Sequence, residues 1–247
     1  MCGIAGEFNF YDLVSQDNVK KMTDAIIHRG PDDEGFYCNG GIGLGHRRLS
    51  IIDLSESGKN PIWSKDRSMV IVFNGEVYNY LEIKSSLTTK GYKFYTETDT
   101  EVVINAIHCW GIEDAVKMFI GMFAFAVWDL RDRSLYLVRD RVGVKPLFYF
   151  KEGNVVLFGS ELRALYAHPK YKKKLNQRGL SQYFNLGYTL NDATVLDNTY
   201  RVPSGHFIHI KAEGTLKLKK YWSIEDPQRA TYKGSFGGAV AELETLA

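Results

Sequence analysis

The sequence has few cysteines, and they follow no recognisable pattern. Cys2, Cys38 and Cys109 lie far apart, cannot all pair, and show no CxxC or Cys/His spacing. This supports neither a disulfide framework nor a zinc site. Unpaired thiols are typical of a reducing compartment, so we expect a cytoplasmic protein.

Long apolar runs and an excess of one charge are absent as well. The N-terminus lacks the basic segment and apolar run of a secretory signal, and no apolar run approaches the ~20 residues of a membrane span. The net charge is only +2, and lysine and arginine are scattered apart from residues 170–174, a pattern typical of a solvated connection. We therefore expect no membrane and no nucleic acid among its partners.

The composition is that of an ordinary globular protein. Of 247 residues, 45% are hydrophobic and 24% charged, so a sizeable core is available, and the length allows one large domain or one domain plus part of another. After Trp222 the chain becomes polar, and residues 237–247 begin a helical pattern and then stop. We predict a domain at residues 1–222, followed at 223–247 by a linker and the start of a second domain.

Hydrophobic periodicity predicts many strands and two substantial central helices. The helices cover 80–90 and 100–110, each followed by glycine. Strands are predicted at 2–10, 48–54, 69–73, 122–129, 135–139, 147–150, 155–158, 206–210 and 216–220, and further helices from Val19 to Gly30, at 161–166 and at 178–184. Asn74-Gly75 is the strongest hairpin signal in the chain. Hairpins with helices between them favour an α+β layered fold over alternating βαβ units.

Cys2 is the first candidate for chemistry. If Met1 is removed, this residue carries both a thiol and a free α-amine, whose unperturbed pKa values, ~8.5 and ~7.7–8.0, are close enough for the amine to accept the thiol proton. A catalytic histidine is then unnecessary. The alternative from position alone is a small apolar residue that opens a strand.

Five segments in one order carry a resemblance to a known family. They are Cys2-Gly3-Ile4-Ala5-Gly6, His28-Arg29-Gly30-Pro31-Asp32, Arg48-Leu49-Ser50-Ile51-Ile52-Asp53, Phe73-Asn74-Gly75-Glu76-Val77-Tyr78-Asn79 and Thr98-Asp99-Thr100-Glu101. Together they resemble the glutaminase domain of glutamine-dependent asparagine synthetase, a class II glutamine amidotransferase with an N-terminal nucleophile. Further matches are Gly121-Met122-Phe123-Ala124-Phe125, Arg139-Asp140-Arg141, Lys145-Pro146-Leu147, Gly159-Ser160-Glu161 and Val202-Pro203-Ser204-Gly205-His206, and the resemblance ends near Trp222.

This resemblance implies a fold and a set of roles. The fold is a four-layer αββα sandwich of two antiparallel sheets between helices, the N-terminal nucleophile hydrolase fold. Cys2 is then the nucleophile, and Asn74 and Gly75 form the oxyanion hole with a side-chain and a backbone N–H. The alternative reading of Asn74-Gly75 is a type I′ turn without a ligand.

The other implied residues bind the amino-acid end of a substrate. Arg48 resembles the residue that pairs with an α-carboxylate, whereas strand alternation sends its neighbour Arg47 to the opposite face. Asp99, with Glu76 nearby, resembles the acceptor of an α-ammonium. On local sequence alone, Arg48 could make a surface pair and Asp99 could cap the helix that follows it.

Two backbone positions and a loop complete the implied site. Backbone groups of Leu49 and Ile51 are expected to contribute to the same pocket. Arg29 and Asp32 are expected to order the loop around Cys2.

The implied reaction is hydrolysis of L-glutamine to L-glutamate and ammonia through a cysteinyl thioester. Ammonia would serve ATP-dependent amidation, of aspartate to asparagine or of a sugar, peptide or other carboxylate. The ATP-pyrophosphatase synthetase domain, in cis or in trans, is marked in the family by SGGxDS, which this sequence lacks. We therefore expect no cofactor on this chain, with ATP and magnesium confined to the synthetase domain. A homodimer, another amide substrate and a non-catalytic regulatory domain stay open.

Overall fold

The computed structural model describes residues 1–49, 58–190, 192–225 and 232–246. In this part of the chain the strands form two antiparallel sheets of six strands each. Sheet A has the order β10 (Thr199–Arg201), β8 (Phe148–Glu152), β9 (Val155–Gly159), β1 (Gly3–Asn9), β3 (Ile42–Arg48), β2 (Asp33–Asn39). Sheet B has the order β12 (Leu216–Lys220), β11 (His206–Ile210), β7 (Ser134–Arg139), β6 (Gly121–Asp129), β5 (Met69–Val77), β4 (Ile62–Trp63).

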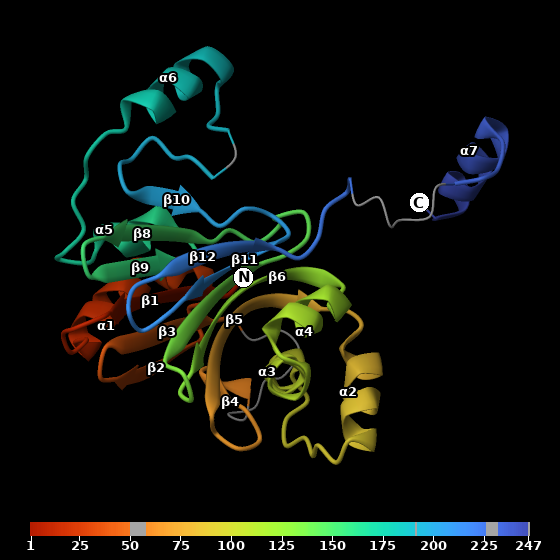
Figure 1. Ribbon diagram of the computed structural model, residues 1–247, viewed down its shortest axis with the longest axis horizontal. Helices are drawn as coiled ribbons and strands as arrows, with labels where there is room; N and C mark the ends of the chain where they lie inside the picture. The colour runs from red at the N-terminus through yellow and green to blue at the C-terminus, as the bar shows by residue number, and fades with distance from the viewer. Residues whose placement is uncertain (50–57, 191, 226–231, 247) are drawn as a thin grey trace.

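Helices cover the outer face of each sheet (Figure 1). Sheet A packs against α1 (Gln16–Asp24) and α5 (Leu162–Tyr166), and a short 3₁₀ helix, η1 (Ile27–Arg29), follows α1. Sheet B packs against α2 (Tyr80–Thr89), α3 (Asp99–Trp110) and α4 (Ile112–Met118). The remaining helices are α6 (Gln177–Leu186) and α7 (Phe236–Leu246). The predicted α+β, four-layer αββα sandwich is confirmed.

Strand alternation distributes the apolar side chains over three core layers. In β5, Val70 and Val72 lie between the two sheets, whereas Ile71 and Phe73 face the helices. In β1, Ile4 and Phe8 lie between the sheets. Because successive side chains in a strand point to opposite faces, a polar residue in this alternating series is placed between the sheets or under the helices by its position alone.

The predicted hairpin at Asn74-Gly75 is wrong. Strand β5 continues through both residues to Val77 and pairs with β6, with Asn74 opposite Ala124 and Gly75 opposite Phe123. A turn signal is local, and the long-range pairing with β6 overrides it. Asn74 therefore occupies a buried strand position, 1% exposed, on the face that Val72 also uses.

The predicted strand at 48–54 is also wrong where it can be compared. Arg48 is the last residue of β3, Leu49 lies outside any strand, and 50–57 are outside the described residues. The glycine-rich segment before Arg48 forms the strand instead. A Cβ at Gly43 or Gly45 would approach side chains of the α1 layer within 2.5–2.6 Å, so glycine lets α1 pack closely on β3.

Most other predicted elements occur within a few residues of their expected bounds. The helix predicted from Val19 to Gly30 is divided in the structure. Helix α1 begins earlier, at Gln16, and ends at Asp24, and the separate 3₁₀ helix η1 follows. The sequence patterns did not predict α4, β2, β4 or β10. None of the helices in the described residues is long and apolar enough to cross a membrane.

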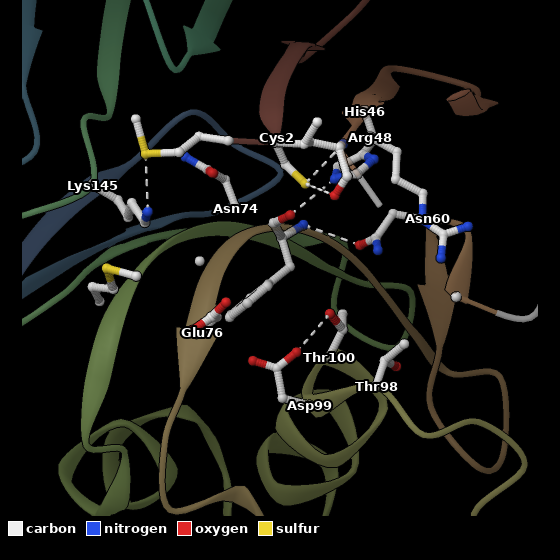
Figure 2. Close-up of a pocket in the computed structure, with 16 residues that line it drawn as sticks. Cys2, His46, Arg48, Asn60, Asn74, Glu76, Thr98, Asp99, Thr100 and Lys145 are labelled. Atoms are coloured by element: carbon white, nitrogen blue, oxygen red, sulfur yellow. Dashed lines mark hydrogen bonds between the residues drawn. The ribbon is translucent and has the colours of Figure 1, made fainter. Parts of the chain in front are cut away.

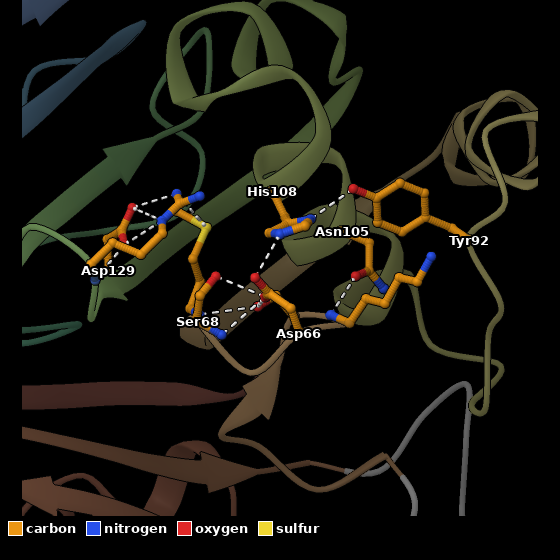
Figure 3. Close-up of polar contacts among 10 residues, drawn as sticks. Asp66, Ser68, Tyr92, Asn105, His108 and Asp129 are labelled. Atoms are coloured by element: carbon orange, nitrogen blue, oxygen red, sulfur yellow. Dashed lines mark hydrogen bonds and ion pairs between the residues drawn. The ribbon is translucent and has the colours of Figure 1, made fainter.

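A polar cluster outside the core fastens the β4–β5 turn to α3 (Figure 3). The Asp66 carboxylate accepts hydrogen bonds from Ser64 Oγ, Ser68 N and Ser68 Oγ at 2.7–3.0 Å, and His108 Nε2 lies 3.0 Å from its other oxygen. The Tyr92 hydroxyl is 2.7 Å from His108 Nδ1. Burial raises the pKa of Asp66, but these hydrogen bonds outweigh it and hold the pKa well below the ordinary value.

One ion pair is buried in the layer between sheet A and its helices. Glu7 of β1 and His168, which follows α5, are 1% and 2% exposed, and Glu7 Oε2 lies 2.9 Å from His168 Nε2. Burial raises the pKa of Glu7, but the hydrogen bond and charge of His168, with the charge of Lys170, outweigh it and lower the pKa overall. The pair therefore stabilises the fold above the unfolded pKa of about 4.3, and this contribution is lost as the pH falls through the folded value.

We predict that Glu7→Gln lowers the free energy of unfolding at pH 7 by about 3 kcal/mol, because it leaves His168 buried without its carboxylate. The difference from wild type should shrink below about pH 4. Urea unfolding at both pH values measures this. The control is Asp114→Asn in the exposed Lys117–Asp114 pair, with an expected cost of about 0.5 kcal/mol or less. Equal costs for the two variants would contradict the prediction.

Candidate active site

A pocket of about 170 Å³ opens where the two sheets meet, at the end that holds the N-terminus (Figure 2). Of the eight residues predicted for the site, seven line this pocket and Ile51 lies outside the described residues. The seven are Cys2, Arg48, Leu49, Asn74, Gly75, Glu76 and Asp99. They come from four separate segments, so the fold itself brings them together.

Cys2, next to the start of β1, accepts hydrogen bonds at both its sulfur and its backbone carbonyl. Leu49 donates its backbone N–H to the Cys2 sulfur at 3.4 Å. Arg29 Nε donates to the Cys2 carbonyl at 2.9 Å, and Arg29 Nη1 lies 3.0 Å from Glu161. The Asp32 backbone N–H donates to the Arg48 carbonyl at 3.1 Å and so closes the loop beside Cys2. The nucleophile candidate therefore sits on a rigid support.

Asn74 is the most unusual residue of the pocket. Its side-chain nitrogen and oxygen are both buried and have no hydrogen-bond partner among the described residues. Leaving a buried polar group unpaired costs about 1–3 kcal/mol, so such groups are rare in folded proteins. An unpaired amide that faces a pocket beside a thiol is suited to donating a hydrogen bond to a bound molecule.

The backbone next to Asn74 is fixed by two buried side chains. His46 Nε2–H donates to the Phe73 carbonyl at 2.9 Å, and the Phe73 N–H donates to Asn60 Oδ1 at 3.1 Å. Burial lowers the pKa of His46 to about 4, so the ring is neutral at pH 7 and can present this single N–H. His46 and Asn60 thus position Asn74.

Gly75 is required by a close approach. Its φ is +155°, and a Cβ at this position would lie 2.1 Å from the Met122 carbonyl oxygen. Any other residue would therefore push β5 away from β6 at the pocket wall. The sequence correctly marks this glycine as special, although the reason is strand packing and not a turn.

Arg48 and Arg47 point to opposite faces of β3, as predicted. Arg48, 7% exposed, lines the pocket, and its guanidinium lies against Gly58. Arg47 pairs with Asp24 and Glu34 beside α1. Only Arg48 can therefore meet a ligand, and its planar guanidinium suits a carboxylate.

Asp99 brings a carboxylate to the wall opposite β3. It is 6% exposed, and its Oδ2 accepts the Val77 N–H at 2.8 Å. Burial, together with the negative charge of Glu76, raises the pKa of Asp99 to about 6 although backbone hydrogen bonds oppose this. The reading of Asp99 as a helix cap is wrong, because Thr98 caps α3 by accepting the Glu101 N–H.

Several lining residues were not predicted from the sequence. They are Met1, His46, Gly58, Asn60, Phe73, Thr98, Thr100, Met122 and Lys145. His46 could have been found, since it lies two residues before Arg48 and therefore on the same face of the strand. Lys145 and Met122 belong to segments that carry the family resemblance, but the sequence assigns neither residue a role.

The arrangement has a clear chemical polarity. The Cys2 thiol and the unpaired Asn74 amide share the pocket with two cations, Arg48 and Lys145, and two carboxylates, Glu76 and Asp99. This matches a small zwitterion that presents a reactive polar group to the sulfur.

Comparison with known proteins identifies relatives over the whole chain. A family model described as the glutamine amidotransferase domain matches residues 1–222. The chain is 36% identical over 251 residues to glutamine-hydrolysing asparagine synthetase 3 of Bacillus subtilis, with 100% of this chain and 40% of that protein covered. For asparagine synthetase 1 of the same organism the identity is 36%, with 90% and 35% covered. The chain thus spans less than half of these relatives.

A solved structure shares the fold. Glutamine phosphoribosylpyrophosphate amidotransferase from B. subtilis, complexed with ADP and GMP, superposes with a TM-score of 0.66 at 19% identity, over 91% of this chain and 50% of that one. The likeness confirms the predicted N-terminal nucleophile hydrolase fold.

We predict that Asn74→Ala leaves the free energy of unfolding unchanged or raises it by about 1 kcal/mol, because it removes an unpaired buried amide. The matched control is Asn105→Ala, which removes an equally buried side chain whose Oδ1 accepts the Lys65 N–H at 2.9 Å. That variant should lose about 1–3 kcal/mol. Urea unfolding compares the two, and an equal loss in both would contradict the assignment of Asn74 as an unpaired group.

Proposed function

Because the chain belongs to the glutamine amidotransferase family, we propose that it hydrolyses the side-chain amide of L-glutamine to give L-glutamate and ammonia. The observation that carries this proposal is the buried, unpaired Asn74 amide in one pocket with the Cys2 thiol. Burying such an amide without a partner lowers the stability of the fold. In the hydrolysis of a carbonyl compound, the same amide can donate a hydrogen bond to the oxyanion.

The reaction begins when the Cys2 thiol attacks the amide carbon of glutamine. The thiol proton passes to the α-amine that removal of Met1 sets free. The negative charge that develops on the carbonyl oxygen is met by the Asn74 side-chain N–H and the Gly75 backbone N–H. The C–N bond then breaks, and ammonia leaves with the proton that the α-amine returns.

A thioester between Cys2 and the glutamyl group remains. Water attacks this thioester, the α-amine accepts a water proton, and the same two donors stabilise the second oxyanion. Collapse releases glutamate and restores the thiol. Both half-reactions use the same residues.

The charged walls of the pocket orient the substrate. Arg48 binds the α-carboxylate through a planar guanidinium, and Asp99, assisted by Glu76, receives the α-ammonium. Both Arg48 and Asp99 are less than 10% exposed, so their interactions are weakly screened by water. The side-chain amide then reaches toward Cys2. Leu49 lines the same pocket, and a backbone contribution from Ile51, which is outside the described residues, stays part of the proposal.

The proposal extends to a larger enzyme. Ammonia would pass to an ATP-dependent synthetase part, in cis or in trans, that amidates aspartate or another carboxylate. ATP and magnesium would bind there, and this chain would need no cofactor of its own. The relatives' names and their greater length support this extension. A cytoplasmic setting, in which the three free thiols stay reduced, belongs to the same proposal.

We predict that Cys2→Ala lowers glutamine turnover by at least about 1,000-fold, because the nucleophile is removed. Cys38→Ala is the matched control. Cys38 is half-buried and burial raises the pKa of its thiol to about 11, so its loss should change turnover by less than about twofold. Ammonia release with glutamine measures both variants. Turnover by Cys2→Ala at the wild-type rate would refute the proposal.

We predict that glutamine binding weakens below about pH 6, because protonated Asp99 can no longer balance the α-ammonium. Calorimetry on the Cys2→Ala chain measures this without catalysis. Adding Asp99→Asn should weaken binding by about 30-fold or more at pH 7.5 and remove the pH dependence near 6.

Two controls accompany that experiment. Glu97→Gln removes a carboxylate that is 83% exposed and outside the pocket, and should leave binding as it was. N-acetyl-L-glutamine, which lacks the ammonium, should bind weakly to the chain that retains Asp99. Equal affinity for both ligands would instead indicate a different amide as substrate.

A further inference from the structure

Lys145 is a buried lysine in the wall of the same pocket as Cys2. It is 4% exposed, and its ammonium contacts the Met1 sulfur at 3.1 Å. Among the described residues no carboxylate lies within ion-pair distance of this ammonium. Lysine is almost never fully buried unless it is paired, so a thioether as its partner within the described part of the chain needs an explanation.

The loop that carries Lys145 is built around two charged side chains. Asp140, 0% exposed, accepts backbone hydrogen bonds from Phe123, Val142, Gly143, Val144 and Lys145 at 2.6–3.3 Å. Arg139 donates to the carbonyls of Lys145, Gly143 and Val202 at 2.7–2.9 Å. Both backbone groups of Lys145 are therefore fixed. The loop holds the lysine in one place.

The position of Lys145 matters because its ammonium contacts Met1, the residue whose removal frees the α-amine of Cys2. The covalent path from the Met1 sulfur to the Cys2 nitrogen runs only through the Met1 side chain and its carbonyl carbon. The ammonium is thus separated from the nitrogen that becomes the free α-amine by at most the length of Met1 plus this 3.1 Å contact, and Lys145 and Cys2 line the same pocket (Figure 2). Removal of Met1 takes away the thioether and leaves two nitrogen groups facing one cavity.

The other charged groups around Cys2 do not replace this cation. Arg29, from η1, is paired with Glu161, and burial lowers the pKa of His46, from β3, to about 4, which keeps it neutral. The remaining ionisable groups of the pocket are Arg48, Glu76 and Asp99, which have opposite signs and which the proposed function assigns to the substrate.

We propose that Lys145 is a positioning residue whose buried ammonium keeps the freed α-amine of Cys2 in its neutral, proton-accepting form. The inference rests on the proposed function. An unperturbed α-amine, with a pKa of about 7.7–8.0, is mostly protonated at pH 7 and is then unable to accept the thiol proton. A like charge close by disfavours the protonated amine and increases the fraction that can act as a base.

The test compares the pH dependence of Cys2 alkylation in wild type and Lys145→Met. Iodoacetamide is uncharged, and peptide mass spectrometry distinguishes Cys2 from Cys38 and Cys109. In Lys145→Met the midpoint of the alkylation profile should move up by about one pH unit, with a rate about tenfold lower on the acidic side. Turnover at saturating glutamine should show the same displacement of its acidic limb.

Two further variants separate charge from structure. Lys145→Arg keeps the positive charge and should keep the wild-type midpoint, whereas Lys145→Gln should behave like Lys145→Met and serves if that variant does not fold. Alkylation of Cys38 in the same samples should not change. A purely structural role would lower the melting temperature without moving the midpoint.

Coincident midpoints in wild type and in the folded neutral variant would overturn the inference. This outcome differs from failure of the proposed function. If wild type does not turn over glutamine, the proposed function fails, whereas the alkylation profiles still decide whether the Lys145 charge acts on the ionisation of the Cys2 residue.

Discussion

The packing of two antiparallel sheets face to face is the constraint on which the site depends. Along β5, β1 and β3, the side chains that point between the sheets are apolar until the strands reach one end. There the same alternation places His46, Arg48 and Asn74 on the inner faces, next to Cys2. The polar residues of the site thus occupy the same face of each strand as the apolar core residues. Close packing of that core keeps them in fixed positions.

Placing polar side chains at buried positions costs folding free energy and changes their protonation and hydrogen bonding. Asn74 is buried without a hydrogen-bond partner in the described part of the chain, and Asp99 is buried enough for its pKa to rise to about 6. In the proposed reaction, Asn74 gains a hydrogen-bond partner and Asp99 an opposite charge when the zwitterionic amide binds, so part of the cost of burying them is offset in the complex. Neighbours such as His46 and Asn60 hold this arrangement through the Phe73 backbone.

The sequence predicted the layered fold and seven pocket residues, but it failed where distant contacts override local signals. Asn74-Gly75 has the composition of a turn, yet pairing with β6 keeps it in a strand. Gly43 and Gly45 weaken the sequence pattern that would predict a strand before Arg48. The structure nevertheless needs glycine at both positions, because α1 packs closely against β3 there. The sequence also allows Asp99 as the cap of α3, but Thr98 accepts the Glu101 N–H, and Asp99 accepts the Val77 N–H instead. Lys145 stayed without a role because its position depends on Asp140 and Arg139.

In the proposed reaction the α-amine of Cys2 is the base, and this role depends on removal of Met1. The most direct measurement determines intact mass and glutamine turnover on the same samples, prepared with and without methionine aminopeptidase. Turnover should be proportional to the fraction of chains that begin at Cys2 and should extrapolate to zero when Met1 is retained. Full turnover by chains that retain Met1 would contradict the account.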